Sequence, residues 1–278
     1  MPVIVAAAAI AGFTVTADAP SLRVATTSSL YDTGLWQYLE PMFEEKFGVK
    51  LDLVCAGTGV ALEYGKRGDV DAVVIHDSAK EEQFVAEGYG VERVPFAYNY
   101  FLVVGPQDDP ARIKGLTPED ASRKLMEQGE KNPQQVRFVS RGDESGTHAK
   151  EKSIWQAAGC NYEAIRKAYW YNEGGSGMGA TLLMANEMNA YTLTDRGTFL
   201  AYRTKLRLVP LVEEGQMLLN VYSVIAVSPC KHPHTRVEIA NDLISFLTSP
   251  EVQRLIAEYG VNDYGTPLFA PCAGAGPH

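Results

Sequence analysis

The run Ser140-Arg141-Gly142-Asp143-Glu144-Ser145-Gly146-Thr147-His148 follows a short apolar stretch, residues 136–139, and precedes a stretch with helical spacing. A Ser-Gly-Thr turn that opens a helix offers unpaired backbone N–H groups and hydroxyls at the positive end of the helix dipole. The Arg141 guanidinium adds a planar set of donors for oxygen atoms. The run therefore predicts a cradle for a small oxyanion.

Two further hydroxyl-bearing turns occur nearer the N-terminus. Thr26-Thr27-Ser28-Ser29 follows a strand-like stretch and precedes apolar residues at helical spacing. Gly57-Thr58-Gly59 likewise joins the strand-like residues 51–55 to the helix-like residues 60–66. We therefore expect three cradles of the same kind, each at a strand-to-helix turn.

The alternation of strand and helix signals along the chain indicates an α/β fold with a largely parallel sheet. Thr117-Pro118-Glu119-Asp120 has the pattern of a helix start, so we expect a helix over 118–128. Two amphipathic helices separated by Ser249-Pro250 close the chain. Further strands are expected at residues 22–25, 71–75, 98–105, 190–194 and 218–227. Further helices are expected at residues 80–87, around Ile154 and Trp155, and after the glycine-rich loop as far as Met188.

The chain has 278 residues, and domains average roughly 150 residues, which favours two lobes. We expect lobe I to contain residues 20–104 and 222–270, and lobe II to contain residues 105–221. The Pro- and Asp-rich residues 106–110 are the first candidate crossover, and the strand 218–227 would carry the chain back. Residues 271–278 are expected to form a loose tail.

The net charge of −9 and the pI near 5.1 argue against nucleic acid or an anionic membrane surface as a partner. The same charge would repel an anion at long range. Capture of an anion must therefore depend on aligned donors at short range, within a Debye length of about 8–10 Å.

The N-terminal segment predicts export. Residues 1–19 contain a short apolar stretch followed by Ala17-Asp18-Ala19, which fits the small-x-small pattern of a signal-peptide cleavage site. The usual positively charged start is missing, so either the start codon is misplaced or the segment is trimmed. The apolar stretch is too short to be a transmembrane helix, and no later apolar run is long enough to span a bilayer.

Four widely spaced cysteines, Cys55, Cys160, Cys230 and Cys272, do not match close-paired zinc patterns. In an oxidising compartment they could form one or two disulfides, with three pairings available, or remain buried thiols. The sequence leaves the pairing open.

Five blocks, in this order, are similar to the tungstate-binding proteins of ABC importers: residues 25–28, 57–62, 140–148, 177–182 and 191–198. The resemblance covers nearly all of the expected mature chain, and the closing helices resemble those of the wider superfamily. It implies the type II periplasmic-binding-protein fold, with two α/β lobes, a central cleft and two crossovers. The family usually has a third threonine where this chain has Ser28, a change that keeps a hydroxyl.

The resemblance also implies a function and a set of site residues. It implies a periplasmic, non-enzymatic monomer that captures tungstate, or also molybdate, without a cofactor or cation site, and passes it to an ABC permease driven by an ATPase. These anions carry no proton near neutral pH, so their site should contain donors only. The expected oxyanion-binding residues are Thr27, Ser28, Thr58, Arg141, Ser145, Gly146 and Thr147.

Several alternatives stay open at this stage. Asp143 either orients Arg141 and the turn or accepts a hydrogen bond from a protonated ligand, which would favour a phosphate receptor. Ser145 and His148 could form a hydrolase dyad, although no Gly-x-Ser-x-Gly elbow surrounds Ser145. The glycine-rich residues 174–179 lack the Lys-Ser/Thr ending of a nucleotide P-loop and are expected to line the cleft or a hinge. A further hypothesis is a sensory module, which binds the anion without transporting it.

Overall fold

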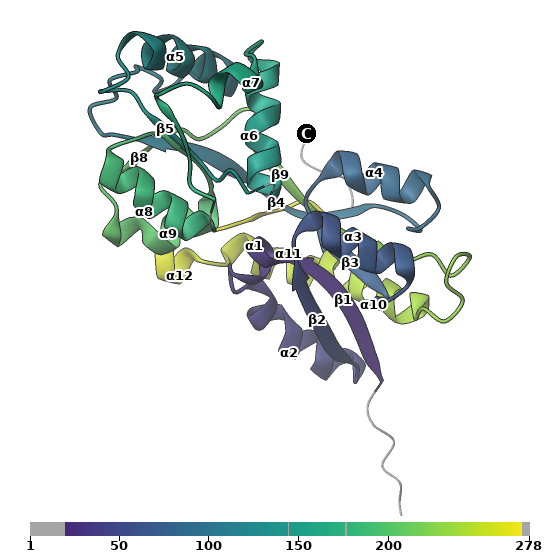
Figure 1. Cartoon of the computed structure of the whole chain (residues 1–278). Helices are drawn as coiled ribbons and strands as arrows, with labels where there is room; N and C mark the ends of the chain where they lie inside the picture. The colour runs from purple at the N-terminus through teal and green to yellow at the C-terminus, as the bar shows by residue number, and fades with distance from the viewer. Residues whose placement is uncertain (1–19, 144, 176, 274–278) are drawn as a thin grey trace, which may run out of the picture.

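The structure is a computed structural model that describes residues 20–143, 145–175 and 177–273. The signal-peptide interpretation of residues 1–19 and most of the expected tail fall outside the described residues. The elements form two groups, connected by two long strands (Figure 1). We use the name lobe I for the group with β1–β3, α1–α4, α10 and α11, and lobe II for the group with α5–α9 and β5–β8.

The elements have the following bounds. The strands are β1 Ser21–Thr27, β2 Lys50–Ala56, β3 Ala72–Ile75, β4 Val94–Gly105, β5 Phe138–Ser140, β6 Tyr171–Glu173, β7 Thr192–Asp195, β8 Val209–Val212, β9 Leu219–Ala226 and β10 Ala270–Pro271. The helices are α1 Ser28–Tyr31, α2 Leu35–Phe47, α3 Thr58–Arg67, α4 Ser78–Ala86, α5 Pro118–Lys131, α6 Gly146–Ala157, α7 Tyr162–Ile165, α8 Met178–Met188, α9 Arg196–Tyr202, α10 Val237–Thr248, α11 Pro250–Glu258 and α12 Val261–Tyr264. Two 3-10 turns span Arg203–Lys205 and Gln216–Leu218.

The main sheet is mixed, so the expectation of a largely parallel sheet is wrong. Its strand order is β10-β4-β9-β3-β1-β2, and β7 and β8 also pair with β4. Pairs β1–β2 and β1–β3 are parallel, whereas β3–β9, β4–β9, β4–β7, β4–β8 and β4–β10 are antiparallel. The β4–β9 pair is antiparallel because β4 leaves lobe I and β9 returns to it beside β4.

Strand β4 itself connects the lobes. Its first part, Val94 to Tyr100, pairs with β9, and its last part, Phe101 to Gly105, pairs with β7 and β8. The passage between lobes therefore occurs in an extended strand, ahead of the Pro- and Asp-rich residues 106–110 that were expected to form the crossover. Within that segment, Asp109 accepts a hydrogen bond of 2.9 Å from Tyr191 Oη of lobe II. The exact lobe boundaries remain predictions.

Three parallel strands of lobe I end at one edge of the sheet. Thr27 at the end of β1 lies opposite Ala56 at the end of β2, and Thr26 lies opposite Val74 of β3. The residues that follow these strands are thus brought together. This register places the turns at Ser28, Gly57 and His76 side by side.

Apolar clusters lie within each lobe, and a further cluster includes residues of both, such as Trp36 of lobe I and Leu182 of lobe II. In lobe I, Phe84 and Ile225 pack with residues of α3 against one face of the sheet. In lobe II, Phe138 and Trp155 contact edge to face with ring centroids 5.4 Å apart, inside a cluster that covers α5, α6 and β5. Fully burying such side chains contributes about 1.5–3 kcal/mol each, which holds each lobe as a firm support for its half of the cleft.

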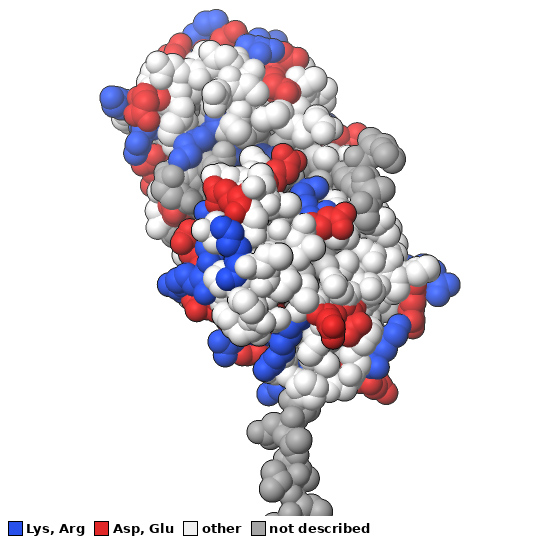
Figure 2. Space-filling view, turned by 90° about the vertical axis from the view of Figure 1, so that its right-hand side faces the viewer, with Lys and Arg blue, Asp and Glu red and all other residues white. Residues whose placement is uncertain are grey.

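Charged side chains of both signs are interspersed on the face shown in Figure 2, with no extended basic field. In the described part of the chain, no helix is both long and apolar enough to cross a membrane.

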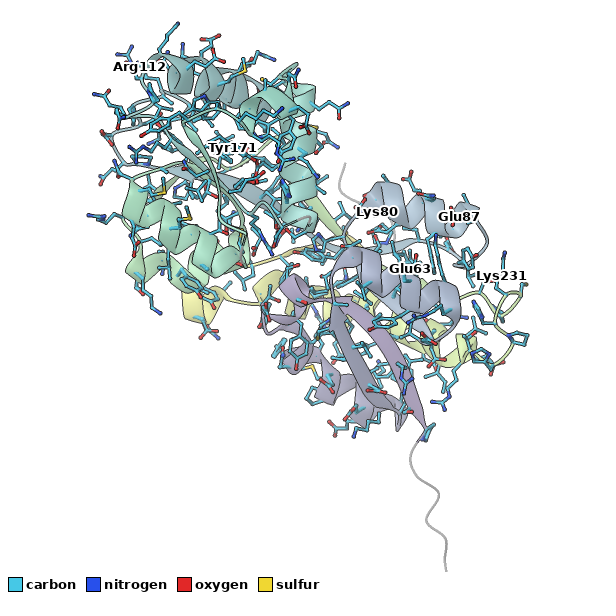
Figure 3. The ribbon with its side chains drawn as sticks, in the orientation of Figure 1. Glu63, Lys80, Glu87, Arg112, Tyr171 and Lys231 are labelled. Carbon is cyan, nitrogen blue, oxygen red and sulfur yellow. The ribbon has the colours of Figure 1, made fainter. Side chains whose placement is uncertain are left out.

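A buried polar network lies inside lobe II, around Tyr171 (Figure 3). Glu151 of α6 is 3% exposed and accepts hydrogen bonds from Tyr171 Oη at 2.6 Å and Trp155 Nε1 at 3.1 Å. Burial raises the pKa of Glu151 to about 7, although hydrogen bonds to its carboxylate act in the opposite direction. Tyr171 Oη also lies 3.3 Å from Tyr162 Oη, which in turn lies 2.6 Å from His148 Nε2. The network therefore ties the interior of lobe II to the first turn of α6.

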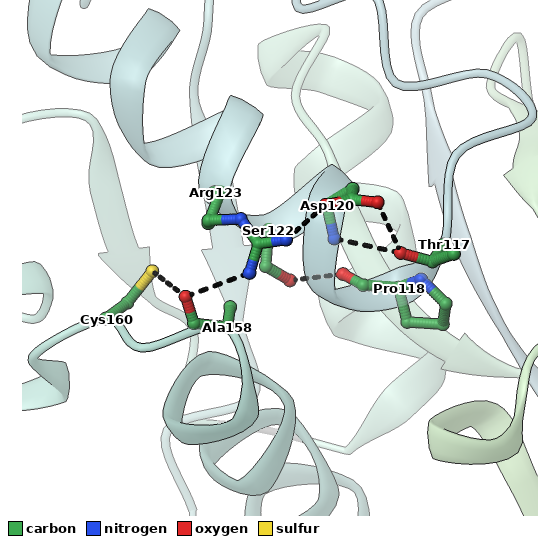
Figure 4. A network of polar contacts seen from close by, with 7 residues as sticks. All are labelled: Thr117, Pro118, Asp120, Ser122, Arg123, Ala158 and Cys160. Carbon is green, nitrogen blue, oxygen red and sulfur yellow. Dashed lines mark hydrogen bonds and ion pairs between the residues drawn. The ribbon is translucent and has the colours of Figure 1, made fainter.

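The start of α5 confirms the predicted helix signal (Figure 4). Thr117 caps the helix by accepting a hydrogen bond of 3.2 Å from Asp120 N, and Pro118 occupies the first turn. Arg123 of the same helix pairs with Asp120 and donates to Ala158 O at the end of α6. These contacts fix α5 against the end of the helix that begins at the predicted cradle.

All four cysteines are free thiols in the structure. Cys160 is buried, Cys272 is half-buried, and Cys55 and Cys230 are exposed. Burial raises the pKa of the Cys272 thiol to about 11, so this thiol is protonated at neutral pH.

Candidate oxyanion-binding site

A cavity of about 220 Å³ lies where three helices begin, between the two lobes. All seven site residues predicted from the sequence line it. The lining consists of Thr27, Ser28, Ser29, Ala56, Gly57, Thr58, His76, Arg141, Ser145, Gly146 and Thr147.

Lobe I contributes two helix starts. Thr27 is the N-cap of α1, and its hydroxyl accepts a hydrogen bond of 3.4 Å from Leu30 N. Thr58 is the first residue of α3, which begins after Gly57 without a side-chain cap. The first N–H groups of α3 therefore keep their donor capacity for a ligand. The buried Thr58 hydroxyl lies at the same place, so this turn offers both kinds of donor.

Lobe II contributes the start of α6. Ser145 is its N-cap: the hydroxyl accepts from His148 N at 3.3 Å, while Ser145 N donates to Asp143 Oδ1 at 3.2 Å. The backbone N–H of Ser145, expected to face a ligand, is thus used within the turn. Gly146 and Thr147 follow as the first helical residues, and their N–H groups have no acceptor inside the helix.

Gly146 brings the two lobes close together. A Cβ atom built on Gly146 would lie 3.5 Å from His76 Cε1 and 3.8 Å from Thr58 Oγ1. The start of α6 therefore lies directly against lobe I, which leaves the cavity between the lobes small.

Arg141 is held in place by Asp143. Arg141 Nε donates to Asp143 Oδ2 at 3.0 Å, and its terminal nitrogen Nη2 contacts the same oxygen. Partial burial disfavours the charged form of Asp143, but hydrogen bonds from Ser145 and Arg141 outweigh it, so its pKa lies below the usual value. Asp143 therefore stays ionised and orients Arg141, as the structural reading of this residue expected, and it does not belong to the cavity lining.

Four lining residues were not among the predicted site residues, and two of them, Ser29 and His76, have polar side chains. Their side chains meet, with Ser29 Oγ 3.1 Å from His76 Nε2. Burial lowers the pKa of His76, and nearby Lys150 acts in the same direction. The available signal was the position of His76 directly after the buried strand β3, whose end lies beside the end of β1.

The described lining contains donors and one fixed cation, with no Asp or Glu. Such a set suits an anion without protons, because an ionised carboxylate in contact would repel it. Within residues 20–143, 145–175 and 177–273, no three His, Cys, Asp or Glu side chains are grouped to hold a metal cation.

A second cavity of about 400 Å³ adjoins the first and shares Ser28, Ser29 and Arg141 with it. Gly177–Gly179 line it, as expected for the glycine-rich loop, and Thr198 of α9 lines it too. Asp195 and Asp32 also line it, and burial followed by the charge of Asp195 raises the pKa of Asp32. These carboxylates make the second cavity unfavourable for an anion.

The hydrolase dyad is not formed. His148 directs Nε2 to Tyr162 Oη at 2.6 Å and contacts Ser145 through its backbone N–H, a capping bond. Among the described residues, His148 therefore does not serve as a general base for the Ser145 hydroxyl.

Two α/β lobes, linked by two crossing strands around a donor-lined cavity, define the chain as a solute-binding protein of the periplasmic-binding-protein class. A family model described as a PBP superfamily domain matches residues 14–251.

Individual relatives narrow this class. The tungstate-binding protein TupA of Peptoclostridium acidaminophilum is 43% identical over 256 residues, which cover 91% of this chain and 86% of that protein. The structure of tungstate-binding protein TupA from Desulfovibrio alaskensis G20 superimposes with a TM-score of 0.83 at 38% identity, covering 92% of this chain and 100% of the other. The tungstate ABC transporter structure from Geobacter sulfurreducens gives a TM-score of 0.73 at 44% identity, with 86% and 98% covered. The chain belongs to the family of TupA tungstate-binding proteins.

Proposed function

We propose that the protein captures tungstate between its two lobes, accepts molybdate as a related cargo, and delivers the anion to an ABC permease driven by an ATPase. The cavity lined by three helix starts and Arg141, with no carboxylate among its described lining residues, is the observation that supports this most directly. The names of the relatives support the choice of tungstate among oxyanions.

Thr27, Ser28, Thr58, Arg141, Gly146 and Thr147 would donate to the oxygens of the anion, and Ser145 would act mainly as the cap that shapes the turn. Charge-assisted hydrogen bonds contribute about 1.5–3 kcal/mol each. Six of them, less the costs of desolvation and lobe closure, would reach the ~12 kcal/mol of nanomolar binding.

The protein acts outside the cytoplasm, as a monomer and without a cofactor, and it catalyses no reaction. Hinge motion about β4 and β9 would close the lobes on the anion. The binding of the Asp143 carboxylate by Arg141 and Ser145 speaks against a phosphate receptor, because the acceptor for a ligand proton is already occupied.

Titration calorimetry with tungstate, molybdate, phosphate and sulfate tests the proposal. We expect tight binding of tungstate and molybdate, with phosphate and sulfate far weaker. A preference for phosphate, or no binding of any of the four anions, would refute it. Size-exclusion chromatography with light scattering checks the monomer.

A further inference from the structure

His76 connects the candidate anion site to the two strands that join the lobes. It follows β3, and its Nε2 lies 3.1 Å from Ser29 Oγ at the cavity wall. On its other side the ring packs on Tyr222 of β9, with ring centroids 5.0 Å apart. The same side chain therefore touches both the cavity and a connecting strand.

Behind His76 lies a buried pair of amides. Asn220 of β9 is 2% exposed and lies opposite Asn99 of β4. Its Nδ2 donates to Asn99 Oδ1 at 3.0 Å and to Tyr222 Oη at 2.8 Å. Among the described residues, however, its Oδ1 has no hydrogen-bond partner of normal geometry. A buried carbonyl oxygen without a donor is costly, so it favours a proton on the nearest donor.

The His76 ring is a donor near this amide. Asn220 is one of the side chains that favour the protonated form of His76. Nε2 is paired with Ser29, which leaves Nδ1 as the ring nitrogen available to donate to Asn220. A proton on Nδ1 makes Nε2 an acceptor in the neutral ring. The Ser29 hydroxyl hydrogen is then directed to His76 and away from the cavity.

Several groups around His76 act on its pKa in opposite directions. Burial is the largest influence and lowers its pKa, Lys150 of α6 also lowers it, and Asp195 and the adjacent Asp77 raise it. Arg141 lines the same cavity and adds positive charge. The ring is therefore neutral beside an empty cavity, and a dianion in the cavity would add a strong influence in favour of the charged form.

We propose that capture of the anion takes up a proton on His76 Nε2, and that Ser29 then turns its hydroxyl hydrogen from His76 toward the anion. The proton comes from solvent. The new N–H donates to Ser29 Oγ, so the cavity gains one donor and one positive charge without any movement of the backbone. The inference rests on the proposed function, because it needs a fully ionised anion in this cavity.

Calorimetry with tungstate in buffers of different ionisation enthalpy measures the protons taken up on binding. Between about pH 6.5 and pH 8.5 we expect uptake of up to about one proton, declining as the pH rises. The affinity should fall by up to about tenfold per pH unit over the range where uptake occurs. His76→Gln should abolish the uptake. His232→Gln is the control, because His232 Nε2 lies 2.8 Å from Lys66 O and His232 does not line the cavity. This variant should keep the proton uptake.

Because His76→Gln could also weaken binding too far for calorimetry, the His76 ring of the unmodified protein is titrated by NMR with and without tungstate. A higher pKa in the loaded protein supports the proposal. Tight tungstate binding with no proton uptake and an unchanged His76 pKa overturns it, while the proposed function survives. Failure to bind tungstate at all refutes the proposed function, and the proton coupling with it.

Discussion

Replacement of Arg141 by alanine should abolish most anion binding while leaving the fold intact. The Arg141 side chain is 16% exposed and is aimed by Asp143 through Nε at 3.0 Å. Two charge-assisted hydrogen bonds from it to an anion would contribute about 3–6 kcal/mol, or roughly 10²–10⁴-fold in affinity. The loss also leaves the Asp143 carboxylate without its cation near the cavity, which adds repulsion for a dianion.

The assay is calorimetric titration with tungstate, combined with thermal unfolding followed by circular dichroism. Arg137→Ala is the matched control, because Arg137 belongs to the same lobe and carries the same charge but bonds to Gln134 and Pro133 O outside the cavity lining. It should leave affinity nearly unchanged. If Arg141→Ala keeps its affinity within about threefold (under about 0.7 kcal/mol), Arg141 does not contact the anion.

Three further changes test separate parts of the site and its support. Thr58→Val keeps the shape but removes a buried hydroxyl, and should weaken tungstate binding about 10- to 100-fold by calorimetry; unchanged affinity would exclude this hydroxyl from the site. Asp143→Asn should weaken tungstate binding while phosphate stays unbound; if the unmodified protein binds phosphate and this variant loses it, Asp143 is a ligand acceptor. Glu151, with its pKa raised to about 7, holds its proton in the folded state over a range where the unfolded state has lost it, so the free energy of unfolding should fall by about 2–4 kcal/mol as pH rises from about 4.5 to 7. In urea titrations at about pH 5 and pH 8, Glu151→Gln should show a smaller difference in the free energy of unfolding between the two pH values than the unmodified protein. An equal difference in both proteins would mean that Glu151 titrates normally.

Local signals in the sequence were sufficient to find the helix starts. Thr27, Thr58 and Thr147 each sit where a strand-like stretch gives way to helical spacing, and the structure has a helix at each place. The Thr117-Pro118 signal likewise marks the first turn of α5. Such patterns depend on neighbours within a few residues, which is why they can be predicted from one sequence.

The path of the connecting strands could not be predicted in the same way. The strand expected at residues 98–105 begins at Val94, four residues earlier, and includes Pro95 beside an irregularity in its pairing with β9. Proline argues against a strand in sequence, but it is tolerated where the ladder is irregular. The antiparallel pairing of β3 with β9 joins residues about 150 apart, and no local pattern reports such a contact.

Ser29 and His76 escaped detection for a related reason. Ser29 stands in the expected Thr26–Ser29 cradle, but the pattern does not tell which of its hydroxyls face the ligand. A lone histidine after a strand, such as His76, is most often structural. Its role depends on the register that sets β1 beside β3 and on the approach of α6 from the other lobe at Gly146. Both features are tertiary contacts, which a local sequence pattern does not report.

The most direct test of the central claim is a crystal structure of the protein with tungstate, using the anomalous signal of tungsten to locate the anion. The account predicts one strong peak in the cavity between the starts of α1, α3 and α6, within hydrogen-bonding reach of Thr58 and Arg141. A peak in the neighbouring cavity beside Asp195, or no ordered tungsten in either cavity, would contradict it.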